Sequence, residues 1–439
     1  MDMDLQDRLQ KAIEEHGVPG ASVAVWRDGR LYEAAAGVVN RNTGVAATTD
    51  SVFQVGSTTK VWTAALVMQL ADEGLVELDS PVGEYLPDFA HGAVTVRQLL
   101  MHSAGFDGDL FEDTGRGDDC LDKYLEYLRG AGRVHEPGEI FSYCNAGYCV
   151  LGALVARLRG VSWEQAMRGH LFGPLGVTHA ALLGEEAVYF RAAVGHVGPD
   201  NAVYSEWLMP RSNAPAGATM SLALRELVAF GRTLAAGGVA PDGTRVLSQE
   251  SVAAMLTPQI DVPGGGAPLA EKWGLGVELF GWGAFGHDGN TPGQSTFWRI
   301  VPGSDFVIAM TGNGGSFAGL VADVAMPVIE EATGLTVPSP RVPPREPAAV
   351  DGAPYEGGYR GPQYGYEVAA AENGLDVTLL PGPLMESMGA TRTTRRYVHF
   401  DGESFISAEP EDGRYDSITF VLRDGRATYL HNGRAVARA

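Results

Sequence analysis

The segment Gly56-Ser57-Thr58-Thr59-Lys60 opens an almost continuous apolar run that reaches Leu70. The run predicts a helix surrounded by protein, because a helix on a surface keeps one polar face. Ser57 and Lys60 are three residues apart, so a helix places both side chains on one face. A lysine buried there has a lowered pKa and accepts the serine proton, which activates the hydroxyl as a nucleophile. The alternative is a helix-capping serine followed by a surface lysine.

On either side of this segment, the sequence predicts strands that share one sheet. Residues 21–26 and 30–38 form a hairpin around Asp28-Gly29, because this dipeptide adopts the positive φ values of a tight turn. A second β region begins near Gly274 and gives way to a helix over residues 317–333. Between these regions, helical stretches alternate with connections rich in Gly and Pro. The expected fold class is therefore mixed α/β.

The end of the chain has a different pattern from the rest. Prolines crowd the segment from Pro338 to Pro347, and this density fits a stiff linker rather than a helix or a central strand. Beyond it, short strands alternate with turn dipeptides such as Asn373-Gly374, Asp412-Gly413 and Asn432-Gly433, as in a β meander. We expect a catalytic domain over residues 1–335, a linker over 336–354 and a small all-β domain over 355–439.

Composition excludes several classes of function. The chain has 439 residues and a formal net charge of −22, which repels nucleic acid and anionic membranes, so neither is an expected partner. Its three cysteines are too few for a disulfide framework, and the acidic start Met1–Leu5 is unlike a signal peptide, so we expect a cytoplasmic protein. The sequence has no phosphate-binding loop and no paired metal ligands, so we expect no cofactor and no metal site.

Two further motifs gain meaning only beside the first. The triplet Tyr143-Cys144-Asn145 precedes a helical run, and on its own it fits a helix cap next to a core aromatic residue. The segment Gly286-His287-Asp288-Gly289-Asn290 opens a strand, where glycines let the backbone N–H groups approach a bound carbonyl closely. Each motif alone is common in proteins.

In chain order, Ser-x-x-Lys, Tyr-x-Asn and His-x-Gly resemble the signature of the penicillin-recognising serine hydrolases. Residues 75–82 and 94–106 are similar to the stretch that follows the serine helix in class C β-lactamases, D-stereospecific peptidases and related esterases. The resemblance covers about residues 5–335. It implies a β-lactamase/DD-peptidase-like sheet flanked by helices plus an all-helical lobe, with the active site between them. The small all-β domain resembles a lipocalin-like domain in size.

The resemblance also implies roles for individual residues. Ser57 would be the acylated nucleophile, Lys60 its proton acceptor, and Tyr143 the group that passes a proton to the leaving atom. Asn145 would bind the substrate amide. The backbone N–H groups of Ser57 and Asn290 would form the oxyanion hole, which stabilises the developing negative charge.

Three other residues depend on the branch of the family. His287 stands where β-lactamases and transpeptidases usually have a lysine, and histidine there is typical of the D-aminopeptidase, esterase and cyclase branches. Gly289 belongs to the same substrate-binding strand. Arg434 is a candidate contact to the substrate backbone or carboxylate, provided that the small β domain covers the cleft. The alternatives are a solvated arginine on a turn and a domain that packs behind the fold.

Tyr-Cys-Asn, His-Asp-Gly and a small β domain after a proline linker resemble the penicillin-binding-protein-type thioesterases of nonribosomal peptide assembly. This branch implies transfer of a peptidyl thioester to Ser57 and release by head-to-tail macrolactam formation. The substrate would then be a peptidyl thioester or another acyl compound, with a carrier protein as one source. A D-aminopeptidase or amidase, a carboxylesterase, a β-lactamase or DD-carboxypeptidase, and an inactive binding module remain alternatives. Sequence alone leaves cyclisation versus hydrolysis open.

Overall fold

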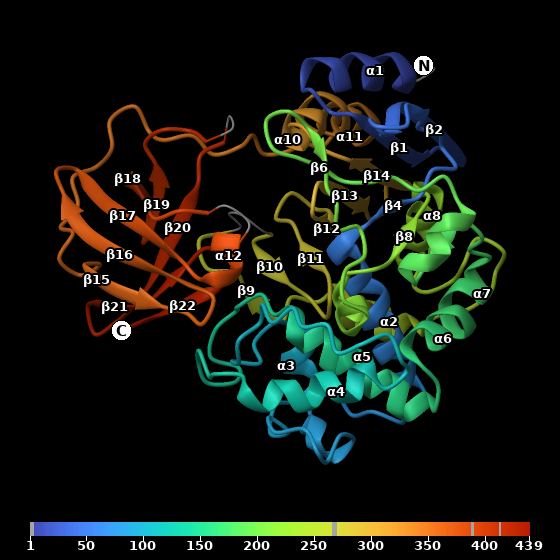
Figure 1. The fold of residues 1–439 in the computed structure, drawn as a ribbon, viewed down its shortest axis with the longest axis horizontal. Helices are drawn as coiled ribbons and strands as arrows, with labels where there is room; N and C mark the ends of the chain where they lie inside the picture. The colour runs from blue at the N-terminus through green and yellow to red at the C-terminus, as the bar shows by residue number, and fades with distance from the viewer. Residues whose placement is uncertain (1–3, 266–269, 388–389, 412–413) are drawn as a thin grey trace.

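The structure is a computed structural model that describes residues 4–265, 270–387, 390–411 and 414–439. A nine-stranded sheet with its helices forms one part, and a closed eight-stranded barrel forms the other (Figure 1). The strands of the large sheet, in spatial order, are β3 (Val45–Ala46), β2 (Arg30–Asn40), β1 (Gly20–Arg27), β14 (Phe306–Gly312), β13 (Gln294–Val301), β12 (Phe285–Thr291), β11 (Glu278–Leu279), β10 (Lys272–Trp273) and β9 (Ile260–Asp261).

The early and late β regions share this sheet, as the sequence predicts. β1 and β2 form the expected hairpin, and Asp28 and Gly29 at its turn have φ values of 51° and 73°. β1 also pairs antiparallel with β14, from Ala21 opposite Gly312 to Trp26 opposite Val307. The first and last strands of the catalytic part therefore lie side by side.

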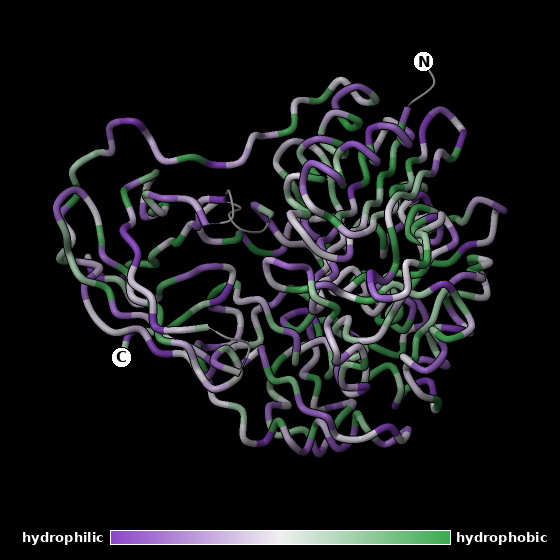
Figure 2. Tube along the Cα trace, turned by 45° about the horizontal axis from the view of Figure 1, so that its top comes forward, coloured by the Kyte–Doolittle hydropathy of each residue, from purple (hydrophilic) through white to green (hydrophobic). Residues whose placement is uncertain are grey.

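Helices cover both faces of the sheet because alternate strand residues point to opposite sides. On one face, α8 (Leu224–Ala235) packs against Trp298 and Val307. A Cβ atom at Gly231 of α8 would lie 2.9 Å from the Val307 side chain, so glycine lets this helix approach closely. The other face packs against α1 (Leu5–Glu15), α10 (Phe317–Leu320) and α11 (Met326–Thr333). Figure 2 shows hydrophobic residues concentrated in the interior of these layers.

The helical lobe surrounds α2 (Thr59–Asp72), which is buried along almost its whole length. Its main partner is α5 (Asn145–Arg159). The remaining helices of the catalytic part are α3 (Val96–Leu100), α4 (Cys120–Tyr127), α6 (Trp163–Met167), α7 (Gly173–Leu175) and α9 (Gln249–Leu256). Two small sheets complete the catalytic part. One contains β4 (Phe53–Gln54), β8 (Ser221–Leu222) and β5 (Ala180–Ala181), and the other contains β6 (His196–Val197) and β7 (Ala202–Val203).

The barrel is the expected all-β domain, and each strand pairs with the next in the chain. Its last strand also pairs with its first, which closes the meander into a barrel around Tyr359, Phe405 and Phe420. The predicted turn at Asp412-Gly413 lies outside the described residues. The strands are β15 (Gly357–Arg360), β16 (Tyr364–Ala371), β17 (Gly374–Pro381), β18 (Thr393–Asp401), β19 (Ser404–Ser407), β20 (Ser417–Arg423), β21 (Arg426–His431) and β22 (Ala435–Arg438), with the short helix α12 (Pro383–Ser387) after β17.

The barrel docks onto the segment that leads into α5. The Tyr143 backbone N–H donates to the Gly433 carbonyl at 3.0 Å, and His431 Nε2 lies 2.9 Å from the Phe141 carbonyl oxygen. Beside these bonds, Ile140 packs against Tyr429 of β21. The barrel thus contacts the backbone of a predicted site residue directly and does not pack behind the fold.

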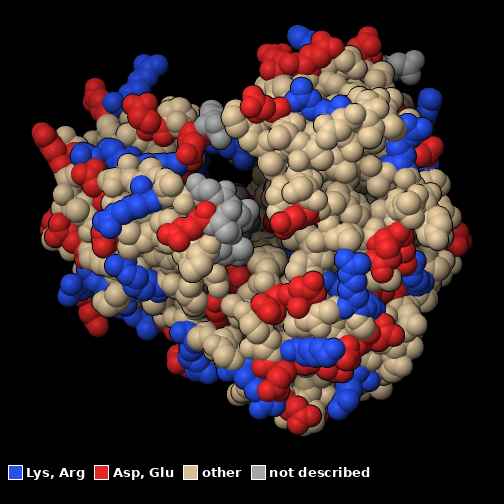
Figure 3. All heavy atoms as spheres, viewed as in Figure 1, with Lys and Arg blue, Asp and Glu red and all other residues tan. Residues whose placement is uncertain are grey.

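The surface carries acidic and basic side chains intermixed, and the face in Figure 3 is hollowed between the barrel and the catalytic part. The three cysteines, Cys120, Cys144 and Cys149, are free and buried. Among the described residues, no helix is both long enough and apolar enough to cross a bilayer.

Candidate active site

Ser57 and Lys60 meet at the start of the buried helix. Ser57 lies in the 3-10 turn η1 (Gly56–Thr58), and α2 follows directly from Thr59. Lys60 Nζ is 3.0 Å from Ser57 Oγ. The Lys60 side chain is completely buried, so the alternative of a surface lysine is wrong. The capping position of α2 is Thr58, so Ser57 is not the cap of this helix.

The partners of Lys60 decide the direction of its lone pair. Nζ donates to Asn145 Oδ1 at 2.7 Å and to the Ala216 carbonyl oxygen at 2.5 Å. Both oxygens can only accept, so a neutral amine places its two N–H bonds there. Its lone pair then points at Ser57 Oγ, the one of these three partners that has a proton to give. This is the arrangement of a general base and its nucleophile.

Burial lowers the pKa of Lys60 to about 7. The Arg434 guanidinium lowers this pKa further, whereas the Cys149 thiol and the Asp109 carboxylate raise it. A large share of the molecules therefore holds Lys60 as a neutral amine near neutral pH. An ordinary lysine stays charged there and has no lone pair to offer.

Tyr143 lies against the same pair. Its ring centroid is 4.9 Å from Lys60 Nζ, and the ring stacks on His102 with centroids 4.3 Å apart. Burial raises the pKa of Tyr143, and a hydrogen bond with Ser57 partly opposes that rise. The resting phenol therefore keeps its proton, which it can deliver to a leaving atom next to Ser57.

His287, on β12, is buried beside Tyr143 and carries no charge at neutral pH. Burial lowers its pKa to about 3, while burial raises the pKa of its neighbour Glu278 to about 8. Nδ1 donates to the Asp288 carbonyl oxygen at 2.5 Å, so Nε2 is the acceptor nitrogen, and it has no partner among the described residues. The strand therefore presents a neutral acceptor where a lysine would present a cation.

The strand β12 passes close to the turn that carries Ser57. A Cβ atom at Gly289 would lie 2.0 Å from the Val55 carbonyl oxygen and 3.2 Å from Ser57 N, so only glycine fits. A Cβ atom at Gly56 would likewise lie 2.5 Å from Asn290 N. The backbone nitrogens proposed for the oxyanion hole are therefore neighbours. The Asn290 side chain accepts a bond from Ser295 Oγ at 2.8 Å, so it is held on β13.

The barrel contributes Arg434 to this site. Arg434 Nη2 donates to Asp109 Oδ1 at 2.9 Å, and Nε pairs with the other carboxylate oxygen. Its guanidinium carbon is 5.2 Å from the Tyr143 ring centroid. The side chain is 33% exposed and paired, so the alternative of a solvated arginine on a turn is wrong.

Sequence reasoning missed Asp109 and His102. Asp109 accepts from Asn145 Nδ2 at 2.8 Å, yet it lies in an irregular loop without a motif. His102 Nδ1 accepts from the Cys144 N–H at 2.9 Å and so holds the segment that carries Tyr143. The buried apolar setting of His102 gave no sequence signal of this contact.

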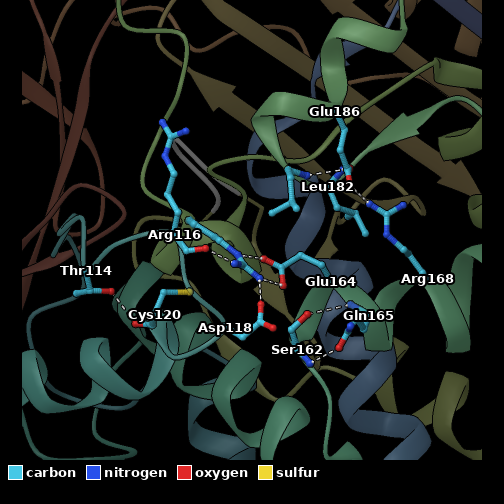
Figure 4. Close-up of polar contacts among 12 residues, drawn as sticks. Thr114, Arg116, Asp118, Cys120, Ser162, Glu164, Gln165, Arg168, Leu182 and Glu186 are labelled. Atoms are coloured by element: carbon cyan, nitrogen blue, oxygen red, sulfur yellow. Dashed lines mark hydrogen bonds and ion pairs between the residues drawn. The ribbon is translucent and has the colours of Figure 1, made fainter.

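Arg211 anchors the loop that carries Asp109. Arg211 pairs with Glu164 at 2.7 Å and with Asp118 at 2.8 Å, and it donates to the Arg116 carbonyl oxygen (Figure 4). Arg211 opens the turn η6 (Arg211–Ala216), whose last residue accepts the bond from Lys60. One element thus fixes both the loop and a partner of the lysine. In the described part of the chain, no group of three or more His, Cys, Asp or Glu side chains could hold a metal ion.

Comparisons with known proteins show the family and the fold of this chain. The family model described as Beta-lactamase matches residues 5–330. Penicillin-binding protein 4 of Amycolatopsis lactamdurans is 42% identical over 367 residues, which cover 81% of this chain and 96% of that protein. The crystal structure of SurE with D-Leu is similar at a TM-score of 0.80 and 30% identity, over 99% of this chain and 98% of SurE.

A further solved structure resembles the catalytic part. The D-amino acid amidase from Ochrobactrum anthropi SV3, complexed with D-phenylalanine, has a TM-score of 0.62 at 24% identity. It covers 75% of this chain and 99% of its own. This likeness supports the fold of the catalytic part. The SurE match, in contrast, extends over nearly the whole chain, barrel included.

Proposed function

The chain belongs to the β-lactamase family and is a serine hydrolase or acyltransferase, and we propose that it cyclises a nonribosomal peptide. The substrate would be a peptidyl thioester with a D-residue at its C-terminus, delivered by a carrier protein. The product would be the head-to-tail macrolactam. The D-residue is proposed because two similar structures were solved with D-amino acids, SurE with D-Leu and the D-amino acid amidase with D-phenylalanine.

The first step forms the acyl-enzyme. Neutral Lys60 takes the proton of Ser57 while Oγ bonds to the thioester carbon, and the C–S bond breaks. Tyr143 would give its proton to the departing sulfur and take the one held by Lys60, so the lysine is neutral again for the second step. The backbone N–H groups of Ser57 and Asn290 would hold the oxyanion between these events.

The second step distinguishes a cyclase from a hydrolase. The N-terminal amine of the peptide attacks the ester carbon, the C–O bond to Ser57 breaks, and the amine proton returns to Oγ through Lys60. Water competes with that amine, so cyclisation needs a covered site that holds the chain folded back. The observation that carries the proposal is the barrel docked directly beside Tyr143, with Arg434 extended to the site.

The charge at the strand also favours this branch. A neutral His287 gives no cation for the carboxylate of a penicillin or a cell-wall peptide. The positive charge of Arg434 is already balanced by Asp109. A neutral peptidyl ester therefore suits the site better than an anionic β-lactam.

A second candidate is hydrolysis of a D-amino acid peptide or amide. It is supported by the fold that the catalytic part shares with a D-amino acid amidase. The same acyl-enzyme would form, and water would replace the amine in the second step.

A linear peptide thioester with a C-terminal D-residue separates the two candidates. We expect a product one water lighter than the free linear acid. The matched control is the same peptide with its N-terminus acetylated, which can give only the acid. Linear acid as the main product from the unblocked peptide would contradict cyclisation, and no product from either peptide would contradict both candidates.

A further inference from the structure

We propose that Asp109 is a positioning residue that fixes the amide orientation of Asn145 and thereby directs Lys60 to Ser57. The inference rests on the acyl-enzyme part of the proposed function and not on cyclisation. Asp109 Oδ1 accepts from Asn145 Nδ2 at 2.8 Å and from Arg434 Nη2 at 2.9 Å. An ionised carboxylate can only accept, so the amide nitrogen of Asn145 must face Asp109.

This choice of orientation has a direct consequence at Lys60. With its nitrogen toward Asp109, Asn145 presents Oδ1 to Lys60 Nζ at 2.7 Å. In the opposite orientation the Asn145 amide would present an N–H, and that donor would compete with Ser57 for the lone pair of the neutral amine. Proton transfer from Ser57 would then fail in that fraction of molecules. Asp109 therefore acts on the nucleophile through two other side chains.

Asp109 also balances the charge that the barrel brings to the site. It pairs with Arg434 through both carboxylate oxygens. Without Asp109, the guanidinium would remain near Lys60 as an unbalanced cation and would lower the pKa of Lys60 further. The other ionisable groups that face Lys60 are Cys144, Cys149, Tyr143, Tyr148, His102, Glu278 and His287.

The loop geometry supports a fixed rather than incidental contact. The Asp109 N–H donates to Asp107 Oδ1 at 3.2 Å, and Asp107 in turn accepts from Gln363 of the barrel at 3.4 Å. Asn213 of η6 donates to the Leu110 carbonyl oxygen at 3.2 Å. Asp109 is thus held from both parts of the molecule.

The test measures labelling of Ser57 by a fluorophosphonate probe as a function of pH, in the full-length chain. Asp109→Asn keeps the shape of the side chain but can donate as well as accept, so it permits both orientations of Asn145. Arg434→Gln is combined with it in a double variant. Arg423→Gln is the control, because Arg423 pairs with Glu139 at the barrel contact and touches none of these groups.

For Asp109→Asn we expect a plateau labelling rate about 10- to 100-fold lower, with the rise in rate moved to lower pH. In the double variant the rise should return toward that of the wild type, because both charges are gone. The plateau should stay low, because Asn145 is still free to turn. Arg423→Gln should label like the wild type.

If the role of Asp109 were purely structural, Asp109→Asn would lower the melting temperature but leave the plateau rate and the pH of the rise unchanged in folded protein. That result would overturn the inference. Unlabelled Ser57 in the wild type would overturn the proposed function and this role with it. Labelled wild type with an unchanged Asp109→Asn profile would overturn this role alone.

Discussion

At Lys60, burial and hydrogen bonding act in the same direction. Burial lowers the pKa to about 7, and two acceptor-only partners leave the lone pair for Ser57. A neutral amine is the form that accepts a proton. Acylation should therefore be slow below the pKa, where Lys60 is charged, and should rise with pH.

The first prediction concerns the pH dependence of acylation. The rate of Ser57 acylation should increase as pH rises through about 7 and then level off. Lys60→Ala should lose nearly as much rate as Ser57→Ala, since the two groups act as one unit and their losses do not add. Stopped-flow acylation with an activated ester, from acidic to mildly alkaline pH, measures both. A flat profile in the wild type would contradict a lysine base.

The second prediction concerns His287→Lys. A second amine near Lys60, in a buried setting, should lower the native acylation rate by roughly 10- to 100-fold, because charge and geometry both change. It should not create efficient penicillin hydrolysis, which needs more than one cation. Nitrocefin turnover and thioester acylation are measured on the same preparation. Rapid nitrocefin hydrolysis by the wild type would favour a β-lactamase over the proposed cyclase.

At the residue scale, the sequence motifs predicted the site residues that stand at a recognisable spacing along the chain. The structure brings together Ser57, Lys60, Tyr143, Asn145 and His287, which lie far apart in the sequence. Asp109 escaped prediction because a carboxylate in an acidic, irregular loop is ordinarily solvated. Its role depends on a partner more than 300 positions later, Arg434. No local pattern contains that pairing.

At the scale of elements, the site lies where the turn η1, directly before α2, meets β12. Both elements were predicted, α2 from its unbroken apolar run and β12 from its glycine-flanked segment. Their close approach was expected from the resemblance alone, because sequence periodicity does not report which strand passes a helix end. The two glycines that allow it, Gly56 and Gly289, mark the place.

The third prediction is that Gly289→Ala disables the site. The added Cβ would overlap the Val55 carbonyl oxygen, so β12 or the Ser57 turn must move, at a cost of about 1–3 kcal/mol in stability. Acylation should fall further than stability, because the oxyanion nitrogens would separate. Gly169→Ala is the control, since a Cβ there meets nothing within 4 Å. Equal acylation by both variants would argue against the close approach.

Barrel closure shows the limit of prediction for elements. Turn dipeptides such as Asn373-Gly374 and Asn432-Gly433 predicted the order of hairpins. Pairing of Tyr359 in the first strand with Arg438 in the last depends on the twist summed over all eight strands. A local pattern therefore predicts a meander and leaves its closure open.

At the scale of the whole molecule, the barrel and the catalytic part form one site. Their contact includes a backbone hydrogen bond at Tyr143. Glu139 accepts a hydrogen bond from Tyr429 and pairs with Arg423, and Arg434 extends from the barrel to the Tyr143 ring. The proline-rich linker and the change to short strands beyond it predicted two domains, but not which face of one meets the other. In the proposed mechanism, this docked face limits the access of water to the ester.

The fourth prediction concerns removal of the barrel. A chain that ends at residue 336 should still acylate on Ser57, because the Ser57, Lys60 and Asn145 contacts lie within the catalytic part. Its products should shift from cyclic peptide toward linear acid, since the cover beside Tyr143 is gone. Circular dichroism establishes that the shortened chain is folded, and product masses give the ratio. An unchanged ratio in a folded chain would remove the barrel from the mechanism.

The most direct test of the central claim is to trap the acyl-enzyme and locate it. The N-acetylated peptide thioester is mixed with the wild-type chain, the reaction is quenched with acid, and the protein is digested and mapped by mass. The acyl group should lie on the peptide that contains Ser57, and be absent in Ser57→Ala. An acyl group on Cys144 or any other residue, or turnover with no covalent intermediate at Ser57, would contradict the account.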